Sequence, residues 1–228
     1  MADCGCRLPE PLHAVFDTAA RSGIPDTAVH RAAHQAILRS FASSARPPSP
    51  AELADTVGAD QEQRAGVLAE LARNDVTGLD TTGAIRLADP FSTQPTAHRV
   101  RISGGATPWA MCAVDALGIP AMLRTDAVIE SADPRTGAAV MVEAAARARA
   151  GDTYPARWQP RHAVVLAGAR PVTGPAASVC CETVNFFADR EGAEEWSRRN
   201  PEVTYTVLDQ EQAVRLGIRT FGTLLGTP

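Results

Sequence analysis

Lysine is absent from this chain of 228 residues, so all 22 basic residues are arginine. Without lysine, the protein's own side chains cannot form a Schiff base with a carbonyl substrate, and they cannot complete the lysine-containing phosphate loop of nucleotide-binding enzymes. The net charge of −4 gives no electrostatic reason to bind nucleic acid or an anionic membrane. We therefore expect no nucleic acid and no membrane among its partners.

Long apolar runs are also missing. No segment approaches the roughly 20 apolar residues that span a bilayer, and the start of the chain lacks the charged and then apolar pattern of a signal peptide. Cysteine is scarce: five residues, an odd number, favour reduced thiols over a disulfide framework. Hydrophobic residues nevertheless make up 45% of the chain, enough for a sizeable core. These features predict a globular cytoplasmic protein with free thiols.

Residues 1–9 precede the first periodic segment and are predicted to form a flexible tail. They contain Cys4 and Cys6, a Cys-x-Cys pair that can hold a soft metal ion but lacks the further ligands of a structural zinc site. An accessory metal-handling role and an idle tail are both open.

Residues 10–90 carry helical patterns and then a hairpin pattern. Apolar residues recur at helical spacing over 12–20 and 29–41, with Asp26 as a cap for the second run. Two further helices are expected to start at capping boxes, Ser49 with Glu52 and Asp60 with Gln63. Residues 76–87 then predict two short strands around a glycine-containing turn. Short helix, turn, longer helix and hairpin is the order of a winged helix-turn-helix domain.

The charge of this winged-helix-like domain argues against DNA binding. Between residues 49 and 75 there are six acidic residues against Arg64 and Arg73. A negative face repels phosphate, so we expect a scaffold that does not bind DNA. The domain is predicted to end in the turn-rich join at 89–95.

Residues 96–228 predict an α+β catalytic domain, in which a mixed β-sheet is flanked by helices. Alternating or apolar runs indicate strands at 99–103, 126–130, 138–143, 162–167 and 203–207. The turn 133–137 makes the second and third of these a hairpin. The last helix is expected to start at a capping box formed by Asp209 and Gln212.

The central candidate for chemistry is a helix predicted to start at Thr107 and to end at Gly118 and Pro120. It places Cys112 and Asp115 three residues apart, on one face of an otherwise apolar helix. A carboxylate is costly to bury there unless it has a use, which favours a functional site. The alternative is that Cys112 packs as a small hydrophobic residue.

A second candidate is the adjacent pair Cys180 and Cys181. In an extended segment neighbouring side chains point to opposite sides, so only one of the two is expected to face the same site as Cys112. From spacing alone, two buried thiols without a function are the simpler interpretation.

The ordered combination of motifs resembles the organomercurial lyase family, also called alkylmercury lyases. The resemblance rests on the winged-helix-like start and on three motifs, Trp109-Ala-Met-Cys-Ala-Val-Asp115, Asp133-Pro-Arg-Thr-Gly137 and Cys180-Cys-Glu-Thr-Val-Asn-Phe-Phe-Ala188. It implies that Cys112, Cys180 and Asp115 cleave the carbon–mercury bond of an organomercurial by protonolysis, in mercury detoxification. Thiolates suit mercury because the ion is soft, and an acid must protonate the departing carbon.

The resemblance further implies no cofactor. Mercury(II) would remain on Cys112 and Cys180, with Asp115 as a further possible ligand, until small thiols or mercuric reductase removed it. Apolar neighbours such as Trp109 are expected to raise the pKa of Asp115, so that it carries a proton near neutrality. The competing hypothesis is a winged-helix sensor that binds mercury without cleaving it, but a sensor calls for a basic recognition helix, which residues 60–74 do not provide.

Two positions depart from the family pattern. Met111 stands where the family typically has an aromatic residue before the helix cysteine, so packing around the substrate is expected to differ. Asp133 stands where the family commonly has a cysteine that we interpret as structural, so this change concerns local packing more than catalysis.

Overall fold

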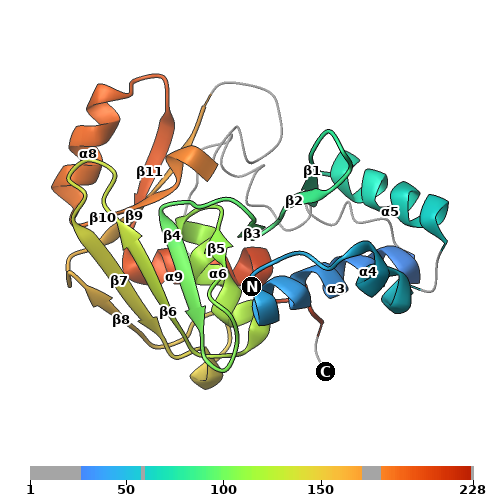
Figure 1. Ribbon diagram of the computed structural model, residues 1–228. Coiled ribbons are helices and arrows are strands. Elements are labelled where there is room, and N and C mark those ends of the chain that lie inside the picture. Colours follow the sequence, from blue (N-terminus) through green and yellow to red (C-terminus); the bar gives the residue numbers. More distant parts are fainter. Residues whose placement is uncertain (1–26, 58–59, 171–180, 227–228) are drawn as a thin grey trace.

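The structure is a computed structural model that describes residues 27–57, 60–170 and 181–226 (Figure 1). Four features predicted from the sequence lie outside the described residues: the Cys4 and Cys6 pair, the helix over 12–20, the Asp26 cap and Cys180. None of the helices in the described ranges has the length and hydropathy needed to cross a membrane.

Within the described residues, three helices precede strand β1. They are α3 (Ala28–Ser44), α4 (Pro50–Val57) and α5 (Gln61–Arg73). Both predicted capping boxes are confirmed: the Ser49 hydroxyl and the Glu52 carboxylate accept each other's backbone N–H, and Asp60 and Gln63 form the same reciprocal pair. Helix α3 is capped by Thr27 and buries Ile37 and Phe41, the latter stacked on Phe91 at 5.3 Å between ring centroids.

An eight-stranded sheet follows, with the order β1-β2-β3-β5-β4-β6-β7-β8. Its strands are β1 (Thr77–Leu79), β2 (Ile85–Ala88), β3 (Phe91–Ser92), β4 (His98–Ile102), β5 (Trp109–Ala110), β6 (Ala127–Ala132), β7 (Ala139–Ala144) and β8 (Ala156–Gln159). Strands β3 and β5 have two residues each, too short for any periodicity in the sequence to reveal them. The predicted hairpins β1–β2 and β6–β7 are confirmed.

A second sheet of three strands has the order β10-β9-β11 and is built from β9 (Val164–Ala169), β10 (Asn185–Phe187) and β11 (Thr204–Leu208). All strand pairings within the described ranges are antiparallel, so the α+β class is correct while the expected mixed sheet is wrong. Hairpins join β1 to β2 and β6 to β7, whereas the chain between β4 and β6 includes α6 and that between β9 and β11 includes α8.

In the part of the chain that the structure describes, the helices that cover these sheets are α6 (Ala113–Leu123), α8 (Arg190–Arg199) and α9 (Gln210–Phe221). The two faces of β9 bury different layers. Val164 and Leu166 pack with Ala193 of α8, whereas Val165 and Ala167 join the main core with α6 and α9. Helix α6 also contacts β4, β5 and β6 of the large sheet, so α6 lies at the centre of the molecule.

Two glycines allow α6 and α9 to pack closely. A Cβ atom at Gly217 would lie 2.9 Å from the backbone nitrogen of Gly118, and one at Gly118 would overlap the Phe221 ring. Both values are below a normal carbon contact, so each position accepts only a hydrogen. The contact fixes α6, and therefore the residue at its start, against α9.

One hydrophobic core extends through both predicted domains. Ile37 of α3, Leu71 of α5, Leu117 of α6 and Phe221 of α9 belong to the same buried cluster. The eight-stranded sheet likewise crosses the predicted join at 89–95, because β3 lies within it. The division into domains at residues 90 and 96 stays a prediction.

Candidate active site

Cys112 is the N-cap of helix α6. Its backbone is extended, with φ −148° and ψ 178°, and its Sγ accepts a hydrogen bond from the Asp115 backbone N–H at 3.4 Å. The predicted start at Thr107 is wrong, because Trp109 and Ala110 form β5 and pair with β3 and β4. Cys112 and Asp115 are nevertheless neighbours as predicted, since the N-cap side chain faces the third residue of the helix.

The predicted end of this helix is also wrong. Gly118 and Pro120 both lie inside α6, which continues to Leu123 and is terminated by Arg124 in the left-handed conformation, φ 51°. Gly118 serves the close contact with α9 rather than a helix end. Pro120 removes one backbone donor from the helix, and near it the Leu117 carbonyl accepts an additional hydrogen bond from the Tyr154 hydroxyl at 2.7 Å.

Cys181 reaches the start of α6 through a short 3₁₀ helix, η2 (Cys181–Thr183). The prediction of an extended segment is wrong for this residue, so the argument from alternating side chains does not apply to it. Hydrogen bonds on both sides hold η2 in place: the Ala113 N–H donates to the Val184 carbonyl at 3.0 Å, the Thr183 hydroxyl donates to the Gly168 carbonyl at 2.8 Å, and the Asn185 side-chain amide donates to the Glu182 carbonyl at 2.9 Å. The first joins the chain after η2 directly to the first turn of α6.

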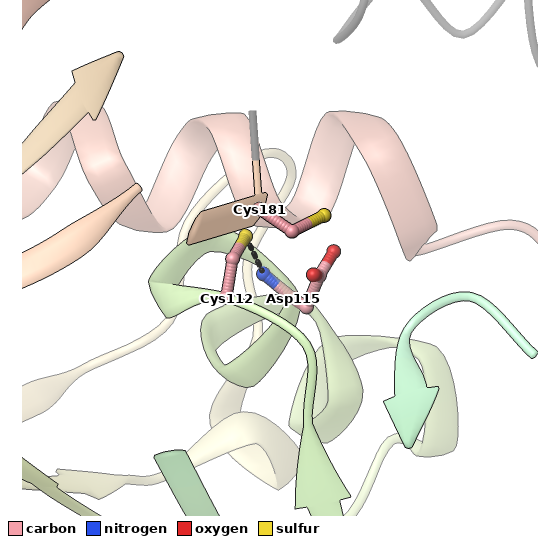
Figure 2. A group of neighbouring side chains, drawn as sticks. All are labelled: Cys112, Asp115 and Cys181. Atoms are coloured by element: carbon pink, nitrogen blue, oxygen red, sulfur yellow. Dashed lines mark hydrogen bonds between the residues drawn. The ribbon is translucent and has the colours of Figure 1, made fainter. Parts of the chain in front are cut away.

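The side chains of Cys112, Asp115 and Cys181 converge, as Figure 2 shows. The two sulfurs and a carboxylate oxygen all lie within 4.8 Å of one another. All three residues are buried, with exposed fractions of 1%, 1% and 7%. Of the predicted trio, the described structure thus brings Cys112 and Asp115 together, while Cys180 lies outside the described residues and its place in the site stays a prediction.

Cys181 is the site residue whose role sequence reasoning left open. Adjacent cysteines are chemically equivalent, and only the backbone conformation decides which sulfur points to the helix. A 3₁₀ helix of three residues has no periodic signature that could have revealed this conformation in advance.

Burial dominates the electrostatics of the site. It raises the pKa of the Cys112 thiol well above its usual value, and the hydrogen bond with Cys181 and the negative charge of Asp115 act in the same direction. Cys112 is therefore a protonated thiol at neutral pH in the free protein. The Asp115 N–H already points at its sulfur, an arrangement that stabilises a thiolate once the proton has left.

A pocket of about 450 Å³ adjoins the site. Met111 and Cys181 line it together with residues from the segment 87–98, including His98, and with Asn185. Because Cys112 and Asp115 are almost fully buried, this pocket offers a route toward them along Met111 and Cys181.

The two departures from the family pattern have clear structural settings. Met111 is 9% exposed and lines the pocket, whereas Trp109 is only partly buried and lies beneath the Arg99 guanidinium at 5.3 Å from the ring centroid. Asp133 is buried and accepts three backbone N–H groups, those of Arg135 and Thr136 in its own turn and that of Ala188 after β10. It joins the β6–β7 turn to the smaller sheet, which fits the structural role expected for this position.

Comparison with known proteins gives the family and the fold of this chain. The sequence model of the alkylmercury lyase family matches residues 91–222, more than half of the chain and the whole of the site. A crystal structure of the mercury-bound form of MerB2 has the same fold, with a TM-score of 0.70 over 94% of this chain and 98% of that chain, at 21% sequence identity. A search of curated proteins gave no significant match. The chain belongs to the alkylmercury lyase family, whose reaction is cleavage of the carbon–mercury bond.

Proposed function

We propose that Cys112, Asp115 and one thiol of the Cys180–Cys181 pair perform this cleavage by protonolysis. The observation that carries the proposal is the buried cluster of two sulfurs and one carboxylate within 4.8 Å. Two thiols suit a soft mercury ion, and a carboxyl group beside them can move a proton. Both requirements of the reaction are met in one small volume.

The first step is capture of the organomercurial by Cys112. Because burial keeps a proton on this thiol, binding of mercury must displace it. A coordinating metal ion deprotonates a thiol, so sulfur bonds to mercury, the proton leaves, and the ligand previously on mercury departs as an anion. The product is a Cys112–mercury–carbon adduct.

The second step transfers a proton to carbon. The Asp115 carboxylate takes the proton of the second thiol, and the resulting thiolate bonds to mercury. A second thiolate increases electron density at the attached carbon, and Asp115 delivers the proton to that carbon as the carbon–mercury bond breaks. The hydrocarbon leaves, mercury(II) stays on two sulfurs, and Asp115 returns to its carboxylate form.

The second thiol is either Cys180 or Cys181, and each is favoured by a different observation. The family motif favours Cys180, whereas the proximity of the Cys181 sulfur to Cys112 and Asp115 favours Cys181. Single serine variants separate the two assignments.

Mercury(II) on two thiolates leaves only by exchange with other thiols. We propose that small solution thiols or mercuric reductase accept it, which requires the reducing conditions expected of the cytoplasm. A relay through Cys4 and Cys6 remains a hypothesis about the tail. No resident cofactor takes part in the proposed reaction.

Helices α4 and α5 with the β1–β2 hairpin are proposed to be a winged-helix scaffold without DNA-binding function. Glu52 pairs with Arg46, and Glu70 contacts both Arg73 and the His30 ring, so these two acidic side chains already have partners within the protein. No observation favours the alternative of a mercury sensor.

The test is hydrocarbon release from phenylmercury or methylmercury with excess small thiol, measured by gas chromatography for the wild type and for Cys112→Ser, Cys180→Ser and Cys181→Ser. Catalytic benzene or methane from the wild type, and none from Cys112→Ser, is the expected result. The variant of the pair that loses turnover identifies the second thiol. Mercury binding without hydrocarbon from the wild type would overturn the proposed activity.

A further inference from the structure

The pocket beside the active site has a buried inner end and an open rim. Met111 and Cys181 line it and are buried, whereas Pro95 and Ala97 line it and are exposed. Cys181 belongs both to this lining and to the cluster of two sulfurs and one carboxylate. The inner end of the pocket, beside Met111 and Cys181, therefore reaches the cluster.

The backbone holds Met111 at this inner end. Its N–H donates to the Pro90 carbonyl at 3.1 Å, and it directly follows β5, which pairs with β3 on one side and β4 on the other. The Thr96 hydroxyl, which also lines the pocket, donates to the Ala110 carbonyl at 2.6 Å. The next residue in the chain is Cys112. Met111 therefore lines the pocket one residue before the thiol that we propose captures mercury.

The proposed second step requires the mercury-bound carbon to lie close to the cluster. Asp115 has to deliver a proton to that carbon, and proton transfer needs the two groups within hydrogen-bond reach. Cys112 and Asp115 are each 1% exposed, so an organic group held next to them is itself largely buried. Burial of an apolar group is favourable, and the pocket beside Met111 and Cys181 provides space for it.

This pocket is large enough for an aryl group. Its volume is about 450 Å³, whereas a cavity of roughly 150 Å³ is enough to hold a benzene molecule. Leu87, Pro95, Ala97 and Met111 give it apolar surface. A methionine side chain is unbranched and adaptable, and its thioether makes favourable contacts with aromatic rings. The lining therefore suits a phenyl group as well as a methyl group.

We infer that this pocket receives the organic group of the mercurial and that Met111 is a specificity-determining residue, whose side chain sets the space for that group at the inner end. The inference rests on the proposed function of the cluster. A bulkier side chain at position 111 takes up part of this space, so it excludes a large organic group before a small one. With methionine there, the protein accepts arylmercury as well as methylmercury substrates.

Two other roles give different expectations. If Met111 only fills space in the core, its replacement changes turnover of a large and a small substrate by the same factor. If the pocket instead admits the small thiol that removes mercury(II), narrowing it raises the thiol concentration needed for turnover and leaves the preference between substrates unchanged. Substrate preference is therefore the quantity that identifies the occupant of the pocket.

The experiment gives the full-length protein phenylmercury and methylmercury together, at equal concentrations and with excess small thiol. Benzene and methane are measured in the same sample by gas chromatography. The ratio of their initial rates is the ratio of the two kcat/KM values, and a partly inactive preparation does not change it, because both substrates compete for the same active molecules. The variants are Met111→Trp, Met111→Leu and, as a matched control, Met141→Trp at a half-buried methionine of β7 outside the pocket lining.

We expect Met111→Trp to lower the benzene-to-methane ratio about 10- to 100-fold, since discrimination by size in an apolar pocket has effects of this order. Met111→Leu nearly conserves the side-chain volume and should stay within about threefold of the wild-type ratio. Met141→Trp should leave the ratio unchanged. If Met111→Trp does not fold, Ala97→Phe narrows the exposed rim without entering the core and should lower the ratio as well.

An unchanged ratio in Met111→Trp, or in Ala97→Phe where that variant takes its place, would overturn the inference while leaving the lyase activity intact. An equal fall in Met141→Trp would do the same. A higher thiol requirement with an unchanged ratio would assign the pocket to the thiol and also overturn it. Absence of both hydrocarbons from the wild type would instead overturn the proposed function.

Discussion

Two kinds of helix start occur in this molecule, and their difference separates stability from chemistry. Helices α5 and α9 begin with the exposed carboxylates Asp60 and Asp209, each in a reciprocal capping box with a glutamine. Helix α6 begins with Cys112, a buried thiol whose sulfur is a weak acceptor at 3.4 Å from the Asp115 N–H. The position that stabilises the other helices is occupied in α6 by Cys112, which we propose as a mercury ligand. Helix α6 compensates by packing, because its residues from Ala113 to Met122 are buried.

The largest effect on turnover is expected when the cysteine at the N-cap of α6 is replaced by serine, a common N-cap residue. Cys112→Ser should abolish hydrocarbon release, because oxygen is a poor ligand for mercury. The free energy of unfolding should stay within about 1 kcal/mol of the wild-type value or increase, since serine is a preferred N-cap. Gas chromatography and denaturant unfolding measure the two quantities. Measurable turnover in this variant would remove Cys112 from the mechanism.

Removing the carboxylate of the same first turn should separate capture from cleavage. Asp115→Ala is expected to retain mercury binding through its thiols but to slow hydrocarbon release about 100- to 10,000-fold, the usual loss on removal of a general acid. Bound mercury is measured by elemental analysis and benzene by gas chromatography. Asp115→Asn, which keeps the size without a transferable proton, is the matched control and should be equally slow. Wild-type release from either variant contradicts the assigned role.

A third change tests whether packing holds α6 in place. Gly217→Ala introduces a Cβ 2.9 Å from the Gly118 nitrogen and 3.0 Å from the Val114 carbonyl oxygen, both backbone atoms that cannot rotate away. We expect a loss of about 1–3 kcal/mol in the free energy of unfolding. The control is Gly66→Ala on α5, where no atom lies within 4 Å of the new Cβ. It should instead stabilise by about 0.5–1 kcal/mol. Equal effects of both variants would show that the close helix contact is unimportant.

The smallest effect is expected at an ordinary cap. Asp60→Ala should cost about 1 kcal/mol of the free energy of unfolding and leave turnover unchanged, because the side chain serves only the first turn of α5. Asp60→Asn keeps a capping oxygen and should retain nearly all the stability. A change in kcat for Asp60→Ala would show that the helical part influences the site.

Short-range rules predicted the parts of the fold that depend on neighbouring residues. The boxes at Ser49, Asp60 and Asp209 are confirmed, because each needs only a side chain three residues from its partner. The same rules were wrong for α6. Thr107 and Pro108 have the pattern of a helix start, but Trp109 and Ala110 form strand β5, which pairs with β3 and β4. The sequence alone does not predict that these strands are neighbours.

The sequence by itself determined the helix caps, the hairpins and the proximity of Cys112 to Asp115, since all of these are set by covalent spacing and local backbone geometry. The tertiary structure decided where α6 begins and ends, that the Cys181 sulfur lies beside Cys112 and Asp115, and that Asp133 joins the β6–β7 turn to Ala188. These features join segments that are far apart in the chain. Their positions follow from close packing of α6 on α9 and from hydrogen bonds to buried polar groups, and no local pattern encodes either.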